Sequence, residues 1–322
     1  MCTAATYKAE DFFFGRNLDY YFTYGEEVVL TPRHFPLNFG AAGILDTHYA
    51  ILGMAHVAGG YPLYYDACNE KGLCMAGLNF VLSACYFPPD ANKDNIAHYN
   101  FIPWILGQCE NVTQARALLA NLNLTGDPFS PKLPTAKLHW IIADRDSCIT
   151  VESVAEGLKV YDNPAGVLAN EPAFPMHLYN LNNFMHLSAG EPGGNFAPEL
   201  PLLRYSQGMG AMGLPGDLSS MSRFVRAAFT RNNSESDPGQ GLGQIFRILD
   251  IVSQTQGCCR LPDGQREKTI YTGCMNADKG IYYYTTYTNQ RITGVDMHRE
   301  NLDAGELRRF PLVTEQDVSM VN

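Results

Sequence analysis

The chain has 322 residues, of which 46% are hydrophobic and 17% charged, a balance typical of an ordered globular protein rather than a disordered one. Its formal net charge of −10 argues against nucleic acid as a partner, because binding to phosphates needs clustered Lys and Arg. The sequence shows no signal peptide and no apolar run near the roughly 20 residues of a membrane helix. We therefore expect a cytoplasmic protein that does not bind a membrane.

Strand patterns dominate the first 100 residues. An N-terminal strand starting at Cys2 is followed by strand-like runs at 11–20 and 49–57, and by a hairpin at 64–81 that turns at 69–72. A helical block is predicted over 102–122, where Asn111 can cap a helix.

The second half repeats the same block pattern. Strands are predicted in 136–154, helices in 220–231 and 242–254, and a closing hairpin in 268–297, with long loops at 188–201 and 231–243. Strand blocks separated by helix pairs are not the strict alternation of a parallel α/β sheet. They favour an α+β protein with antiparallel sheets and helices on the outside, in one domain over 1–322.

Neither a metal nor a cofactor is expected. The nine cysteines form no pair or Cys/His set at zinc spacing. GMGAMG (208–213) matches a dinucleotide-binding pattern, but Leu214-Pro215-Gly216 follows it and would break the helix that this pattern requires.

Cys2 has an unusual position, immediately behind the initiator methionine. Once Met1 is removed, its α-amine, with a pKa near 7.7–8.0, could accept the proton of its own thiol. Arg16 could return beside Cys2 in an antiparallel hairpin, and Asp19 could hold the α-ammonium group. The residues alone leave open an equal alternative, in which Arg16 and Asp19 form an ordinary salt bridge at a turn.

Several motifs occur together and in one order: MCT, FGRNLDY, NEKGLCMAGLNF (69–80), GVLANEPAF (166–174), GLPGDLSSMSRFVRAAF (213–229) and IYTGCMN…KGIYYYTTYTNQRITGVDM (270–297). With them the chain resembles the choloylglycine hydrolases, N-terminal-nucleophile hydrolases that include bile salt hydrolases and penicillin V acylases. The resemblance covers nearly the whole length. It implies a four-layer αββα sandwich of two antiparallel sheets flanked by helices.

The resemblance also implies roles for residues. Cys2 would be the nucleophile, freed by ordinary methionine removal, while Arg16 steadies its thiolate and Asp19 its amine. Asn79 and Asn170 match the asparagines that bind the oxyanion.

A further catalytic arginine is implied at Arg223. Arg226, one helical turn later, is the alternative for that role.

Asn79 indicates the bile salt branch, since penicillin V acylases more usually carry tyrosine there. By position, the apolar wall for a steroid would comprise Leu18, Phe129, Leu133 and Leu138, with Tyr20 and Tyr24 nearby; plain core packing is the alternative for each. In 205–210, Ser206 and Gly208 resemble taurine-preferring members, whereas Gln207 replaces an arginine, so we expect activity on glycine and taurine conjugates.

The resemblance implies conjugated bile salts as substrates and a homotetramer. Two other functions stay open at this point. One is penicillin V acylase, other N-acyl amide hydrolase or amine N-acyltransferase activity within the same family. The other is a catalytically silent, thiol-rich binding protein.

Overall fold

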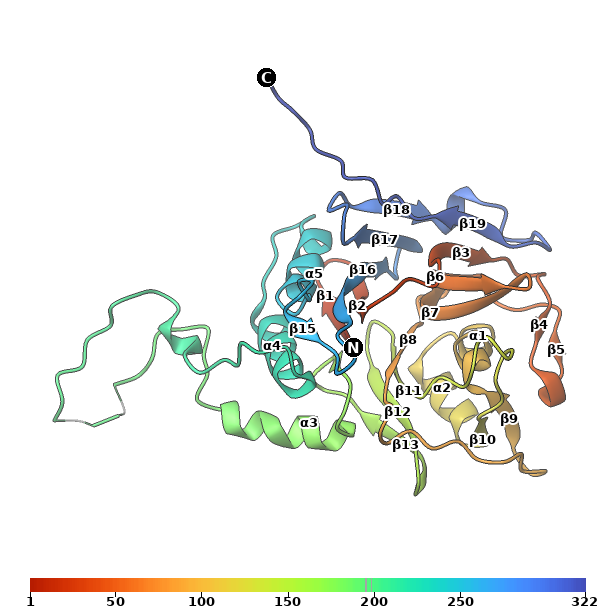
Figure 1. Ribbon diagram of the computed structural model, residues 1–322, viewed down its shortest axis with the longest axis horizontal. Helices are drawn as coiled ribbons and strands as arrows, with labels where there is room; N and C mark the ends of the chain where they lie inside the picture. Colours follow the sequence, from red (N-terminus) through yellow and green to blue (C-terminus); the bar gives the residue numbers. More distant parts are fainter. Residues whose placement is uncertain (195, 198) are drawn as a thin grey trace.

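Two antiparallel β-sheets form the centre of the computed structural model, which describes residues 1–194, 196–197 and 199–322 (Figure 1). The first sheet consists of β1 (Cys2–Lys8), β2 (Phe12–Tyr20), β14 (Val167–Leu168), β15 (Cys259–Arg260), β16 (Arg266–Asn276), β17 (Ile281–Thr286) and β18 (Thr293–Asp296). Its strand order is β14-β1-β2-β16-β17-β18, and β15 also pairs with β16. The N-terminal strand β1 therefore lies inside this sheet, as predicted.

The second sheet packs against the first. It consists of β3 (Glu27–Thr31), β6 (Ile51–Ala58), β7 (Tyr61–Asn69), β8 (Cys74–Asn79), β11 (Leu138–Ala143), β12 (Cys148–Val154), β13 (Gly157–Asp162) and β19 (Arg308–Pro311). Its strand order is β13-β12-β11-β8-β7-β6-β3-β19. Two small pairs lie outside both sheets: β4 (Leu37–Asn38) with β5 (Ile44–Leu45), and β9 (Asp94–Ala97) with β10 (Leu122–Thr125).

Helices cover the outer faces of the sheets. Helices α4 (Ser220–Asn233) and α5 (Gly241–Asp250) pack on the first sheet, and α1 (Phe101–Leu106) and α2 (Val112–Leu119) on the second. Helix α3 (Phe174–Asn180) packs beside α4 (Figure 1). This arrangement confirms the predicted α+β class and αββα layering.

Buried apolar side chains form two clusters that match the layers. One cluster joins the two sheets with α4 and α5, and includes Phe14, Leu78 and Phe224. The other fills the space between the second sheet and helices α1 and α2, and includes Trp140 and Phe101. Burial on both faces explains why the strands of both sheets are rich in apolar residues.

The helical block predicted over 102–122 forms a pair of helices, as the predicted block pattern implies, but it ends before residue 122. Two short helices occupy this segment, separated near Gly107, and residue Leu122 already begins β10. The cap at Asn111 is confirmed, because its Oδ1 accepts a hydrogen bond from Gln114 N at 3.0 Å.

Among the described residues, no helix combines the length and apolar character needed to cross a membrane.

Candidate active site

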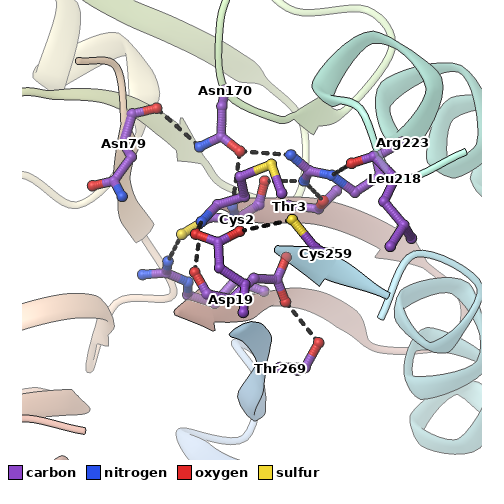
Figure 2. Close-up of polar contacts among 12 residues, drawn as sticks. Cys2, Thr3, Asp19, Asn79, Asn170, Leu218, Arg223, Cys259 and Thr269 are labelled. Atoms are coloured by element: carbon purple, nitrogen blue, oxygen red, sulfur yellow. Dashed lines mark hydrogen bonds and ion pairs between the residues drawn. The ribbon is translucent and has the colours of Figure 1, made fainter. Parts of the chain in front are cut away.

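Cys2 is the first residue of β1 and only 2% exposed. Its backbone N–H donates to Asn170 Oδ1 at 2.8 Å (Figure 2). The ammonium group of Met1 donates to Asp19 O at 2.6 Å and to Glu267 Oε1 at 3.1 Å, and Asp19 N donates to Met1 O at 2.9 Å. As long as Met1 is attached, the nitrogen of Cys2 is an amide and cannot act as a base.

Arg16 lies beside the thiol because β2 pairs with β1 in antiparallel register, with Arg16 opposite Ala4. Its Nη2 donates to Cys2 Sγ at 2.7 Å, and the side chain is only 1% exposed. Burial alone would lower the pKa of Arg16, but its electrostatic interactions, among them those with Cys2 and Asp66, raise it above its usual range. Arg16 is therefore a permanent cation aimed at the sulfur, which favours the thiolate.

Asp66 in β7 is a residue of this site that sequence reasoning missed. It is fully buried, and its Oδ2 lies 3.7 Å from Arg16 Nη1. The hydroxyls of Tyr271 and Tyr282 donate to its two oxygens at 2.6 and 2.7 Å. A charged residue inside the apolar run YYDAC was the available signal, but only the packing of the two sheets reveals its partner.

Replacing Asp66 by Asn should destabilise the fold, because it leaves the buried Arg16 with one counter-charge fewer. We expect the free energy of unfolding to fall by about 3–5 kcal/mol, measured by denaturant titration. The matched control is Asp317→Asn, which removes the partner of the exposed Arg291 and should change stability little. Equal effects of the two substitutions would contradict the assigned role of Asp66.

Asp19 is completely buried next to the N-terminus. Its Oδ1 accepts from Thr269 Oγ1 at 2.6 Å, while Oδ2 has no partner among the described residues. Burial raises the pKa of Asp19, and the charges of Arg223 and the N-terminus oppose this. With Met1 in place its carboxylate does not bond to Cys2 N. The alternative salt bridge between Asp19 and Arg16 is also not formed, since Arg16 pairs with Asp66.

Asn170 follows β14 and joins Cys2 to the second sheet. Its Oδ1 accepts from Cys2 N and from Arg223 Nη2, the latter at 2.7 Å, and its Nδ2 donates to Asn79 O at 2.9 Å (Figure 2). An amide nitrogen carries two hydrogens, so one N–H of Asn170 is left to donate. The side chain of Asn79 makes no hydrogen bond to another described residue, and its amide can donate as well.

Of the two candidate arginines, Arg223 reaches the site. It lies on α4, fully buried, and its Nη1 donates to Cys2 O and Thr3 Oγ1. Burial lowers the pKa of Arg223, opposed by the charges of Asp19 and Cys2. Arg226 instead donates to Gly216 O at 3.0 Å.

Leu18 and Leu138 of the predicted apolar wall lie next to site residues by strand register. Leu18 is paired with Cys2 across β1 and β2, and Leu138 with Asn79 across β8 and β11. Leu18 is buried in the core cluster that joins the two sheets, and half-buried Leu138 packs against the cluster between the second sheet and helices α1 and α2. A role for these two residues in substrate binding stays a prediction.

Tyr20 and Tyr24 belong to an aromatic cluster at the end of β2. The ring of Tyr20 lies 4.5 Å from that of Tyr21, 5.0 Å from that of Phe22 and 6.2 Å from that of Tyr24. Phe22 and Tyr24 are 37% and 41% exposed. The cluster is therefore an apolar surface that faces solvent.

Phe129 and Leu133 lie on the segment between β10 and β11. The ring of Phe129 lies 6.2 Å from that of Tyr61 and lines a cavity of about 480 Å³, whose described lining contains none of the predicted catalytic residues. Leu133 is half-buried in a turn, where its N–H donates to Ser130 O at 3.0 Å. A role for these two residues in substrate binding stays a prediction.

In the described part of the chain, no three or more His, Cys, Asp or Glu side chains are grouped to hold a metal ion.

Comparisons with known proteins agree with the motifs. The profile of the linear amide C-N hydrolases, choloylglycine hydrolase family, matches residues 2–310. The chain is 50% identical over 325 residues to a bile salt hydrolase/transferase of Lactiplantibacillus plantarum, with 100% of both chains covered. Among solved structures, a mutant of the conjugated bile acid hydrolase from Clostridium perfringens superimposes with a TM-score of 0.93 at 36% identity, covering 100% of both chains. A penicillin V acylase from Agrobacterium tumefaciens shares the fold, with a TM-score of 0.77 at 18% identity over 97% of this chain and 92% of its own.

Proposed function

Because the chain belongs to the choloylglycine hydrolase family and is a hydrolase of linear amide C–N bonds, we propose that it cleaves glycine and taurine conjugates of bile acids with Cys2 as nucleophile. The contact of 2.7 Å between Arg16 Nη2 and Cys2 Sγ carries the chemical part of this proposal. The names of the relatives at 50% and 36% identity support the substrate class.

The reaction begins when the α-amine of processed Cys2 accepts the thiol proton and the thiolate attacks the amide carbonyl carbon. The carbonyl oxygen becomes an oxyanion, to which Asn170 Nδ2 and Asn79 donate. The ammonium group then protonates the amide nitrogen, the C–N bond breaks, and glycine or taurine leaves. Water attacks the remaining thioester and releases the bile acid and the thiol.

Two buried charged groups support this chemistry. Asp19 supplies a carboxylate beside the N-terminus, where it can hold the ammonium group that donates to the leaving amine by a charge-assisted hydrogen bond. Arg223 holds the carbonyl of Cys2 and the Oδ1 of Asn170, so it fixes the nucleophile relative to the oxyanion donor.

The test of the substrate class is kinetics on glycocholate, taurocholate and penicillin V, measured side by side. We expect turnover of both bile salts, with penicillin V the poorest substrate. Preference for penicillin V would place the protein in the other branch of the family.

Transfer of the acyl group to an amine differs only in the second half of the reaction, where an amine replaces water. The relative from L. plantarum is named a hydrolase/transferase, which favours this second activity. Mass spectrometry of the products formed with free amino acids present measures it. A catalytically silent binding protein would show no turnover and no loss of binding on alkylation of Cys2.

A single domain over 1–322, a homotetramer and a cytoplasmic location are part of the proposal. Sedimentation of the purified protein tests the assembly state.

Removal of Met1 should be a condition for activity, since it alone frees the α-amine of Cys2. Intact-mass measurement of the active enzyme should show a chain without Met1. Full activity in protein that retains Met1 would exclude the α-amine as the base.

A further inference from the structure

The backbone around Asn170 is held by side chains rather than by a sheet. Strand β14 ends at Leu168, so the next peptide groups have no strand partner. Three side chains bond to these peptide groups in place of a neighbouring strand. Ser220 Oγ accepts from Asn170 N at 2.8 Å, His177 Nε2 lies 2.9 Å from Asn170 O, and His139 Nε2 lies 3.0 Å from Ala169 O.

Both histidines must donate to these carbonyls, because a carbonyl oxygen only accepts. His177 is fully buried on α3, and its ring stacks 4.7 Å from that of Phe224, the neighbour of Arg223. Burial lowers the pKa of His177 to about 4, so it is a neutral ring with its hydrogen on Nε2. Its Nδ1 has no partner among the described residues.

The second histidine is fixed by a carboxylate. His139 Nδ1 lies 3.0 Å from Glu152 Oε1, and both residues are fully buried. The same oxygen accepts from Phe174 N at 2.9 Å, at the start of α3. Glu152 thus links the strand that carries His139 to the helix that carries His177.

We propose that His177 and Ser220 are positioning residues that fix the backbone of Asn170 and thereby aim its side-chain amide at the oxyanion. The inference rests on the proposed role of Asn170 as an oxyanion donor. Four elements converge on this one residue: α3 through His177, α4 through Ser220 and Arg223, β8 through Asn79 and β1 through Cys2. A group that must meet the transition state within a fraction of an ångström gains from such support, since misplacement by about 1 Å can cost a hundredfold in rate.

The test is a double-mutant cycle on bile salt hydrolysis. His177→Phe keeps the stacked ring but removes the donor, and should lower kcat between about ten- and a hundredfold with KM changed less than about twofold. His177→Gln should restore most of the rate, because its amide can donate to the same carbonyl. In an Asn170→Ala background, His177→Phe should cost nothing further, since there is no amide left to aim.

Ser220→Ala is the second variant and decides the question if His177→Phe does not fold. It should show the same pattern: a lower kcat, an unchanged KM and no effect in the Asn170→Ala background. The matched control is His48→Phe, which removes a buried histidine that bonds backbone carbonyls of Tyr49 and Phe35, and should leave kcat unchanged.

An undiminished kcat in both His177→Phe and Ser220→Ala, or equal losses in the wild-type and Asn170→Ala backgrounds, would overturn the inference. If Asn170→Ala itself leaves kcat unchanged, the proposed oxyanion role has failed instead. The two failures are therefore distinguishable.

Discussion

Cys2→Ser should nearly abolish turnover while leaving the fold intact. The substitution exchanges only sulfur for oxygen in a side chain that is 2% exposed, so packing changes little. A hydroxyl has a far higher pKa than a thiol, and neither the contact with Arg16 nor a base as weak as an α-amine can compensate.

The measurement is kcat on glycocholate, with the melting temperature as a check of the fold. The matched control is Cys258→Ser, which makes the same exchange of sulfur for oxygen at an exposed position and should leave kcat unchanged. A Cys2→Ser enzyme that keeps most of its rate would show that another group is the nucleophile.

Asn170→Ala should lower kcat by roughly a hundred- to a thousandfold with little change in KM. It removes the amide donor whose hydrogen bond to the substrate strengthens only as the carbonyl oxygen becomes an oxyanion. The control is Asn123→Ala, which removes a buried side-chain amide away from the site. The amide of Asn123 donates to Pro88 O. A pure effect on KM would mean that Asn170 positions the substrate and that another donor serves the oxyanion.

Asn79 allows a comparison at the same oxyanion. Asn79→Ala should cost less than Asn170→Ala if Asn79 donates through its backbone N–H, which the substitution keeps. Asn79→Tyr should shift selectivity from bile salts towards penicillin V, because it adds bulk opposite Leu138. Both variants are measured as kcat and KM on the two substrates, and unchanged selectivity in Asn79→Tyr would contradict a role in substrate choice.

Strands β7 and β8 were predictable because two apolar runs flank a clear turn. Strand β19 was not, because its sequence RRFP lies on a sheet edge and is mostly exposed. Helix α3 was missed because only Phe174 and His177 in its seven residues are buried, too few to show a helical period. Local patterns indicate elements only where they bury a regular face.

The position of Cys2 behind Met1 suggested a nucleophile, but the residues alone left the roles of Arg16 and Asp19 open, and the resemblance to a known family decided between the alternatives. Asp66 and His177 could not be inferred, because their partners are 50 and 7 residues away in sequence and on other elements. The choice between Arg223 and Arg226 depended on which side of α4 faces Cys2, and both positions fit the sequence pattern equally well.

The Arg16–Asp66 pair has a mechanical consequence. Arg16, Tyr271 and Tyr282 belong to the first sheet, whereas Asp66 and the carbonyls of Tyr65 and Gly77 that accept from Arg16 Nη1 belong to the second. These buried bonds connect the two sheets directly beside the sulfur of Cys2. If one sheet shifted relative to the other, either these bonds would break or the guanidinium of Arg16 would move away from the sulfur of Cys2. The reactivity of the Cys2 thiol therefore depends on the two sheets keeping their relative position.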